Sequence, residues 1–524
     1  MHTIMKKSNI LIVLALAALP LMAQETYENA NLATEDLTGT ARYIGMGGAM
    51  EALGADISTI STNPAGIGLF RRSSLSTSVG LISQQDAQNF DWSKKTSMAF
   101  NQIGFVYAHQ SEDDSYLNFG FNYHISRNFN HILSAAASMS HASSNKLSYA
   151  KGYEDVFGLQ YNNNNEVIGD GNAFNQIDYL NYNALLDSDD GVYRYSEASA
   201  FDFNRGSKGY VGEYEVNISG NIHDRVYLGL TMGIKDVNYK NYSEYSEMLV
   251  GAGYVYYNDE RRIDGEGFDV KAGVIFRPVE YSPFRVGLYV HTPTWYSLTT
   301  KNYTSINNQS TAGLYDNGSS EEVYDFKLYT PWKFGVSLGT TVGDFLAMGA
   351  TYEYSDFGNL DSRIKTGSSY DWYSDSYYED SSSDNVMNAH TEKTLKGVHT
   401  LKLGAELKAD EHFAVRLGYN FLSSMYDKNG FKDGTLDSPG SYYASATDFT
   451  NWKSTNRITA GIGYSIENWN FDLAYQYSTT KGDFTPFMSY YAGEGDPLIS
   501  DNVAPWVEVE NNRHQVLMTI GCRF

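Results

Sequence analysis

The sequence has 524 residues, of which 15% are aromatic and 19% charged, and its formal net charge is −24. The single cysteine excludes a disulfide framework and any structural zinc or iron–sulfur site built from several thiolates. The acidic charge argues against nucleic acid as a partner, because phosphate binding needs a basic surface.

Residues 1–23 have the pattern of a secretory signal peptide. Lys6 and Lys7 precede an apolar run at residues 10–21, and Ala23 precedes a plausible cleavage site before Gln24. We therefore expect residues 1–23 to be removed on export. Because the residues directly after the apolar run include no cysteine, we expect no lipid anchor.

Residues 24–72 do not alternate apolar and polar side chains, and glycine clusters in them. The cluster is not a dinucleotide fingerprint, because no strand precedes it and the GxGxxG spacing is absent. Glycine lets backbone segments pack closely in a confined space. The residues of interest here are Gly45, Gly47, Gly48, Asn63, Pro64, Ala65 and Gly66.

From Ser73 to Phe524 the sequence alternates with a period of two, which indicates strands with two different faces. Arg416, for example, lies between the apolar residues Val415 and Leu417. We predict fourteen strands, at residues 73–83, 98–109, 115–128, 210–221, 225–239, 263–276, 284–299, 324–342, 344–356, 397–408, 411–422, 454–466, 468–479 and 512–524.

The predicted connections alternate between short ones, such as residues 222–224, 343 and 467, and long ones, such as 129–209, 357–396 and 423–453. This alternation is typical of an all-β outer-membrane barrel with an even number of strands, tight periplasmic turns and long extracellular loops. On the outer face we expect Val415, Leu417, Ile462, Leu473 and Met518, whereas a polar exchange at the inward Arg416 should cost little.

The chain ends in an apolar alternation that finishes on Phe524. This end resembles the signal read by the barrel-assembly machinery, so we expect that machinery as a partner. Closing the barrel would also pair an edge strand that would otherwise invite aggregation.

The stretch around Gly45, Gly47 and Gly48, followed by Asn63-Pro64-Ala65-Gly66 before the first strand, resembles the FadL-type family. These are long-chain fatty-acid and aromatic-hydrocarbon transporters of the bacterial outer membrane. The resemblance implies a barrel of about fourteen strands at residues 73–524 and an N-terminal plug, the hatch, at residues 24–72. It also implies a non-enzymatic protein without a cofactor, whose partners are hydrophobic small molecules and outer-membrane lipid.

In this family the ligand is held in an apolar pocket above the hatch and released sideways through a kinked strand. The resemblance places that kink in the strand at residues 115–128, where we assign it to Gly120 and Asn122. We expect the hatch to begin at the periplasmic side and Asn63-Pro64 to fix it inside the barrel. A simple turn into the first strand is the alternative for Asn63-Pro64.

Other readings stay open. A structural or adhesive barrel, or a heme-binding one, is the main alternative, and an outer-membrane phospholipase or protease is a further one. The eleven histidines show no HExxH motif, no GxSxG elbow is present, and we expect no metal site.

Overall fold

The computed structural model describes residues 25–112, 115–158, 160–161, 167–169, 173–187, 192–372, 375–492 and 499–524. The predicted signal peptide lies outside these residues, as does Gln24. Within the described ranges, no helix is long and apolar enough to cross a membrane.

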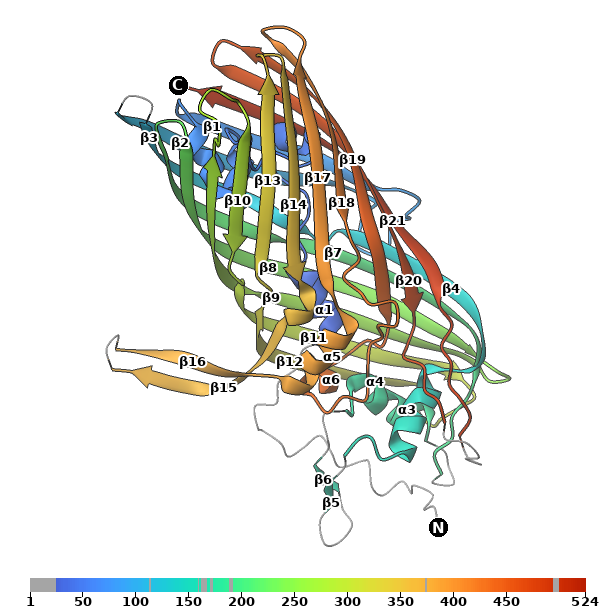
Figure 1. Ribbon diagram of the computed structural model, residues 1–524. Helices are drawn as coiled ribbons and strands as arrows, with labels where there is room; N and C mark the ends of the chain where they lie inside the picture. Colours follow the sequence, from blue (N-terminus) through green and yellow to red (C-terminus); the bar gives the residue numbers. More distant parts are fainter. Residues whose placement is uncertain are drawn as a thin grey trace.

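The chain from Ser74 onward forms a closed antiparallel barrel of 14 strands, as predicted (Figure 1). The first and last strands pair from Ser74↔Arg523 to Gln84↔Arg513, which closes the sheet. Most strands are continuous: β1 (Ser74–Gln84), β2 (Thr96–Glu112), β7 (Ala198–Ile222), β8 (Val226–Leu249), β9 (Gly253–Phe276), β18 (Phe413–Leu422), β19 (Phe449–Ile466), β20 (Trp469–Thr485) and β21 (Val507–Arg523).

Each of the remaining barrel strands is interrupted and consists of two segments with separate labels. They are β3 (Ser115–Asn128) with β4 (His131–Ala142), β10 (Arg285–His291) with β11 (Trp295–Ser310), β12 (Asn317–Tyr329) with β13 (Lys333–Val342), β14 (Leu346–Asp356) with β15 (Asp361–Asp371), and β16 (Ser376–Ser383) with β17 (Gly397–Lys408). The two segments pair with the same neighbouring strand, as β3 and β4 do with β7, and β10 and β11 with β9. Strands β5 (Gln160–Tyr161) and β6 (Val167–Gly169) form a small separate hairpin.

The alternation predicted the two faces of the strands correctly. The five residues expected on the outer face, Val415, Leu417, Ile462, Leu473 and Met518, are all exposed, whereas Arg416 between two of them is buried. The outer face therefore carries an apolar band around the barrel.

Several strands extend well beyond this band, and here the predicted lengths are wrong. Residues 240–262 were expected in a long connection, but β8 and β9 run on until only residues 250–252 connect them. Likewise β4 and part of β7 occupy the expected loop 129–209, and β15 and β16 occupy part of 357–396. Backbone pairing does not need an apolar outer face, so the ladder continues where outward residues such as Lys240 and Glu244 become polar.

Helices gather at the barrel end opposite the tight turns. They are α3 (Ser144–Tyr153), α4 (Gln176–Leu180), η5 (Asn181–Leu185), η6 (Phe357–Asn359), α5 (Asn385–Thr394) and α6 (Pro439–Tyr442). Figure 1 shows them there, with the β15–β16 hairpin projecting away from the wall.

The hatch lies inside the barrel as α1 (Thr26–Ala33), α2 (Ala41–Gly45), η3 (Ile57–Ser61) and η4 (Pro64–Leu69). Its helices begin where the sequence supplies caps: Thr40 accepts from the Tyr43 N–H, and Asn63 precedes Pro64 at the start of η4. We expected the hatch to begin at the tight-turn end, and this is wrong. Thr26 instead bonds to His390 of α5, and Arg71 pairs with Asp224 at a tight turn.

Candidate ligand cavity and hatch

Asn63 joins two segments of the hatch and lies against the wall glycines Gly273 and Gly287. Its side-chain nitrogen donates to the Glu51 carbonyl at 3.0 Å, and its side-chain oxygen accepts from the Ala65 N–H at 3.2 Å. Pro64, Ala65 and Gly66 are buried in the first turn of η4. Asn63-Pro64 is therefore more than a simple turn into the first strand, because Asn63 caps the helix η4 and also joins two segments of the hatch.

The hatch glycines approach the wall through other glycines. Gly47 and Gly48 adopt φ angles of 63° and 80°, which favour glycine. A β-carbon on Gly45 would lie 3.2 Å from the Cα of Gly461, and one on Gly418 of β18 would collide with the Gly47 nitrogen. Hatch backbone and wall backbone are thus in direct contact.

Ion pairs join the hatch to the wall around much of the barrel. Each of the pairs takes one partner from residues 25–72 and the other from a strand or a connection between strands: Glu25–Lys432, Glu28–Arg261, Glu35–Lys235, Asp36–Arg127, Arg42–Glu406, Glu51–Lys402 and Arg71–Asp224. Removing one partner of a buried pair leaves an uncompensated charge, so these pairs fix the position of the hatch.

Arg416 belongs to the same lumenal network, which overturns the expectation that a polar exchange there would cost little. Its guanidinium lies 2.6 Å from both Glu406 and Asp472, and Glu406 also pairs with Arg42 of the hatch at 2.9 Å. A neutral side chain at position 416 would leave Asp472 without this partner.

Gly120 and Asn122, assigned to the kink, lie in an unbroken part of β3. Gly120 pairs with Val106 on one side and Asn217 on the other. A β-carbon there would lie 3.2 Å from Ile60 of the hatch, so the glycine makes room for the hatch. Asn122 donates to Glu215 at 3.1 Å.

The interruption lies further along, at residues 129–130 between β3 and β4. Asn128 accepts from the Asn130 N–H at 2.9 Å, which forms a local turn that competes with the ladder. The register against β7 also shifts between Ile125 and Arg127. Opposite the break, Gly209 has a φ of 116°.

A gap in the wall accompanies this break. Strands β2 and β3 pair only from Gln102↔His124 to Glu112↔Ser115, and β4 pairs with β7. Among the described residues, no ladder joins residues 96–101 to β3 or β4. The ring of Phe100, which is 40% exposed, stacks on Tyr123 across this place with 5.8 Å between ring centroids.

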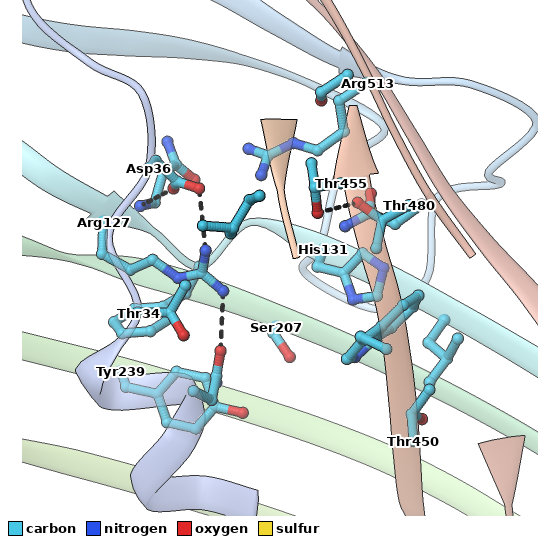
Figure 2. A pocket seen from close by; sticks show the side chains of 18 of the residues that line it. Thr34, Asp36, Arg127, His131, Ser207, Tyr239, Thr450, Thr455, Thr480 and Arg513 are labelled. Carbon is cyan, nitrogen blue, oxygen red and sulfur yellow. Dashed lines mark hydrogen bonds and ion pairs between the residues drawn. The ribbon is translucent and has the colours of Figure 1, made fainter. Parts of the chain in front are cut away.

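A cavity of about 270 Å³ lies above the hatch and reaches this gap. Ile125, Arg127, Phe129 and His131 from the broken strand line it, and so does Phe100. Figure 2 shows Arg513 extending into the cavity from β21, with Asp36 and Arg127 joined nearby. Because Phe100 is also exposed on the outer surface, the cavity approaches the outer face of the barrel here.

The lining is both basic and aromatic, whereas an apolar pocket was expected. Seven Lys or Arg side chains line the cavity against four Asp or Glu, a surplus of three positive charges in a chain whose net charge is −24. The apolar part of the lining includes Phe129, Leu133, Met425, Phe449 and Trp452.

Three arginines form the centre of this basic lining. Arg127 pairs with Asp36 at 2.9 Å, and Arg457, 8% exposed, donates to Asn420 at 2.8 Å. No hydrogen bond or ion pair joins the Arg513 guanidinium to another residue in the described part of the chain. This group can bind an anion, since guanidinium donors match a carboxylate in charge and geometry.

A second cavity, of about 160 Å³, shares the hatch residues Thr34, Asp36, Leu37 and Thr38 with the first. His124 and Glu213 line it, and together with Glu215 they place possible ligand atoms within 4.8 Å of one another. Lys271 pairs with both glutamates, at 2.8 Å from Glu215. Lys271 and Lys235 already supply two ammonium groups to these carboxylates, so the cluster is better described as part of the ionic network than as a metal site.

Sequence reasoning missed the arginine group and the position of the break. Arg457 and Arg513 occupy inward phases of strands whose outer faces are apolar, and this phase was a usable signal. The two asparagines that flank Phe129 were a usable signal for the break.

The chain matches no family model and no curated protein. In fold it is similar to a solved toluene transporter, TbuX from Ralstonia pickettii, with 13% identity, coverage of 93% of this chain and 99% of that chain, and a TM-score of 0.50. A solved FadL homologue from Pseudomonas aeruginosa aligns with 11% identity, 94% and 99% coverage and a TM-score of 0.47. The first of these supports the same barrel fold.

Proposed function

We propose that this protein is a bacterial outer-membrane channel that takes up long-chain fatty acids by passive transport. The apolar outer band suits a lipid bilayer, and the similar fold of a toluene transporter supports a channel for hydrophobic molecules. In this proposal the ligand binds in the cavity above the hatch and leaves sideways through the wall.

The basic lining of the cavity is the reason for proposing a fatty acid as the ligand. Arg457 and Arg513 supply donors for a carboxylate, and the aromatic and aliphatic side chains beside them suit an acyl chain. A neutral hydrocarbon has no anionic group that could pair with this surplus of positive charge. Burying the acyl chain gains about 25 cal/mol per Å² of apolar surface, which favours a partly apolar cavity over an aqueous pore.

The gap between β2 and β3 supports the sideways route. The ladder is missing where Phe100 and Ile125 line the cavity, so a ligand there meets these two side chains and no backbone ladder on its way to the bilayer. The opening assigned to Gly120 and Asn122 moves, in this proposal, to the break at residues 129–130. Gly120 then has a different role: it leaves room for Ile60 of the hatch against the wall.

The first experiment measures binding of labelled oleate and of toluene to purified protein. Replacing both Arg457→Gln and Arg513→Gln should weaken oleate binding by about 10- to 100-fold, because charged hydrogen bonds contribute about 1.5–3 kcal/mol. Toluene binding should stay unchanged. Arg262→Gln, on the exposed outer face, is the matched control. Unchanged oleate binding in the double variant would exclude the carboxylate site.

The second experiment tests the route. Phe100→Cys and Ile125→Cys are introduced together with Cys522→Ser and joined by a short bis-maleimide. Cross-linked cells should lose oleate uptake, whereas either single cysteine treated in the same way should keep it. Uptake that persists in the cross-linked cells contradicts lateral release. Mass spectrometry of lipid that copurifies with the protein gives an independent view of the ligand.

A further inference from the structure

Side chains, not backbone pairs, bridge one end of the gap in the wall. Gln84, the last residue of β1, reaches β4: its amide nitrogen donates to the Ile132 carbonyl at 2.7 Å, and its amide oxygen accepts from the Ile132 N–H at 2.9 Å. Asn130 donates to Ser97 at 3.1 Å beside it.

The Gln84 amide reproduces the two hydrogen bonds that a neighbouring strand residue would make with Ile132. Gln84 is 7% exposed and Ile132 is 6% exposed, so both groups are buried while these bonds exist. The edge of β4 is therefore satisfied at this point by one side chain.

A bridge made by the Gln84 side chain can open more easily than a ladder of backbone hydrogen bonds. A backbone rung separates only when a strand moves, whereas a side-chain amide leaves its partner by rotating about its own bonds. Opening at Gln84 therefore requires no change in the β1–β2 or β4–β7 pairing. Both ladders are continuous up to this place, at Ser83↔Thr96 and His131↔Ser207.

The connection that follows Gln84 is anchored outside the wall, so the backbone of Gln84 stays in place. In residues 85–95, the Trp92 ring lies 3.9 Å from the Lys208 ammonium, and Phe90 stacks on Tyr242 at 5.9 Å. Ser93 donates to the Ser207 carbonyl at 3.4 Å. The side chain of Gln84 can then move while its backbone stays in place.

We propose that Gln84 is a specificity-determining residue of the transport route: its side chain sets the width of the gap and thereby the bulk of the molecule that passes. This inference rests on the proposed lateral route. A slim acyl chain passes with Gln84 in place, and a bulkier group passes only when the amide has moved aside.

The test measures access from the bilayer to the cavity. Ala99, which is buried and lines the cavity next to the gap, is replaced by cysteine in a Cys522→Ser background. The purified protein in liposomes is then labelled with two maleimides dissolved in the bilayer, one on a hexadecyl chain and one on a sterol.

In the Gln84→Ala variant, sterol-maleimide labelling should accelerate about tenfold, the effect of losing about 1.4 kcal/mol of hydrogen bonding, with hexadecyl labelling changed by less than about twofold. Gln476→Ala is the matched control, because Gln476 lines the same cavity on β20 and, among the described residues, its side chain makes no hydrogen bond to β4. An unchanged ratio of the two rates in Gln84→Ala, or an equal change in Gln476→Ala, overturns the proposal.

The two proposals fail separately. Labelling that depends on Gln84 while cross-linked cells still take up oleate supports the role of Gln84 at the gap and removes lateral release as the uptake route. Loss of uptake on cross-linking with labelling independent of Gln84 supports the route and removes Gln84 as its selective residue. Heat-modifiable migration of each variant confirms that its barrel is folded.

Discussion

Gly273 on the barrel wall leaves the room that the side-chain oxygen of Asn63 occupies, and a β-carbon at position 273 would collide with it. A wall position and a hatch position more than two hundred residues apart are thus fitted to each other. Gly287 on the neighbouring strand β10 faces the nitrogen of the same amide, at 2.9 Å from where its β-carbon would be.

Replacing Gly273→Ala should therefore displace the hatch and destabilise the protein by about 1–3 kcal/mol, the usual cost of overpacking. Thermal unfolding in detergent, followed by heat-modifiable migration, measures the change. Gly521→Ala is the control, because the atoms nearest a β-carbon there are 3.8 Å away. Equal stability of the two variants would show that the hatch adapts freely.

Lys402 joins Glu51 of the hatch to Glu353 of the wall, at 2.8 Å from each carboxylate. Lys402→Met should cost about 3–5 kcal/mol, because it leaves buried carboxylates without a cation. Adding Glu51→Gln and Glu353→Gln should restore much of the loss. Lys301→Met, at an exposed position of β11, should change the midpoint of unfolding little.

Leu417 is 64% exposed and lies midway along β18. Leu417→Arg should cost about 2–4 kcal/mol in a bilayer, the range for a cation at the midplane. Asn258→Arg, at an outward position of β9 where the outer face is already polar, should cost far less. Folding yield in liposomes distinguishes them, and equal yields would place the bilayer elsewhere.

His390 of α5 links the start of the hatch to the barrel end opposite the tight turns. Its ring nitrogens lie 3.0 Å from the Thr26 hydroxyl and 3.0 Å from the Phe431 carbonyl, and burial lowers the pKa of His390 below its usual 6.5. A lowered pKa means that the folded state favours the neutral ring. The contact is therefore at full strength above pH 6.5 and weakens as the pH falls below it.

Hydrogen exchange of the amides of α1, corrected for its intrinsic pH dependence, should be faster at pH 5.5 than at pH 7.5. His390→Gln should remove this difference. A difference that persists in the variant would show that His390 is not its source.

The sequence could predict what depends on local periodicity. The alternation around Leu417 gave the outer face, and the glycines at 45, 47 and 48 indicated close packing. No sequence pattern indicates how far along the barrel axis a residue lies, or where a strand ends once its outer face becomes polar. Residues 240–262 were therefore placed in a connection, although their backbone pairs like that of the strands on either side.

Contacts across the lumen were beyond reach for a related reason. Glu51 and Lys402 are 351 positions apart, and only the register of the whole barrel brings them together. The inward phase of Arg457 and Arg513 was visible, but their meeting above the hatch depends on the course of the hatch through the lumen.

That course limits the order in which the protein can assemble. The hatch runs from α5 at one end of the lumen to Asp224 at the other, and on the way its charged groups pair with β3, β8, β9 and β17. A barrel that closed first would have to admit this charged segment through a finished wall. We therefore expect the N-terminal segment to be enclosed while the sheet is still open, so that the β1–β21 seam forms last.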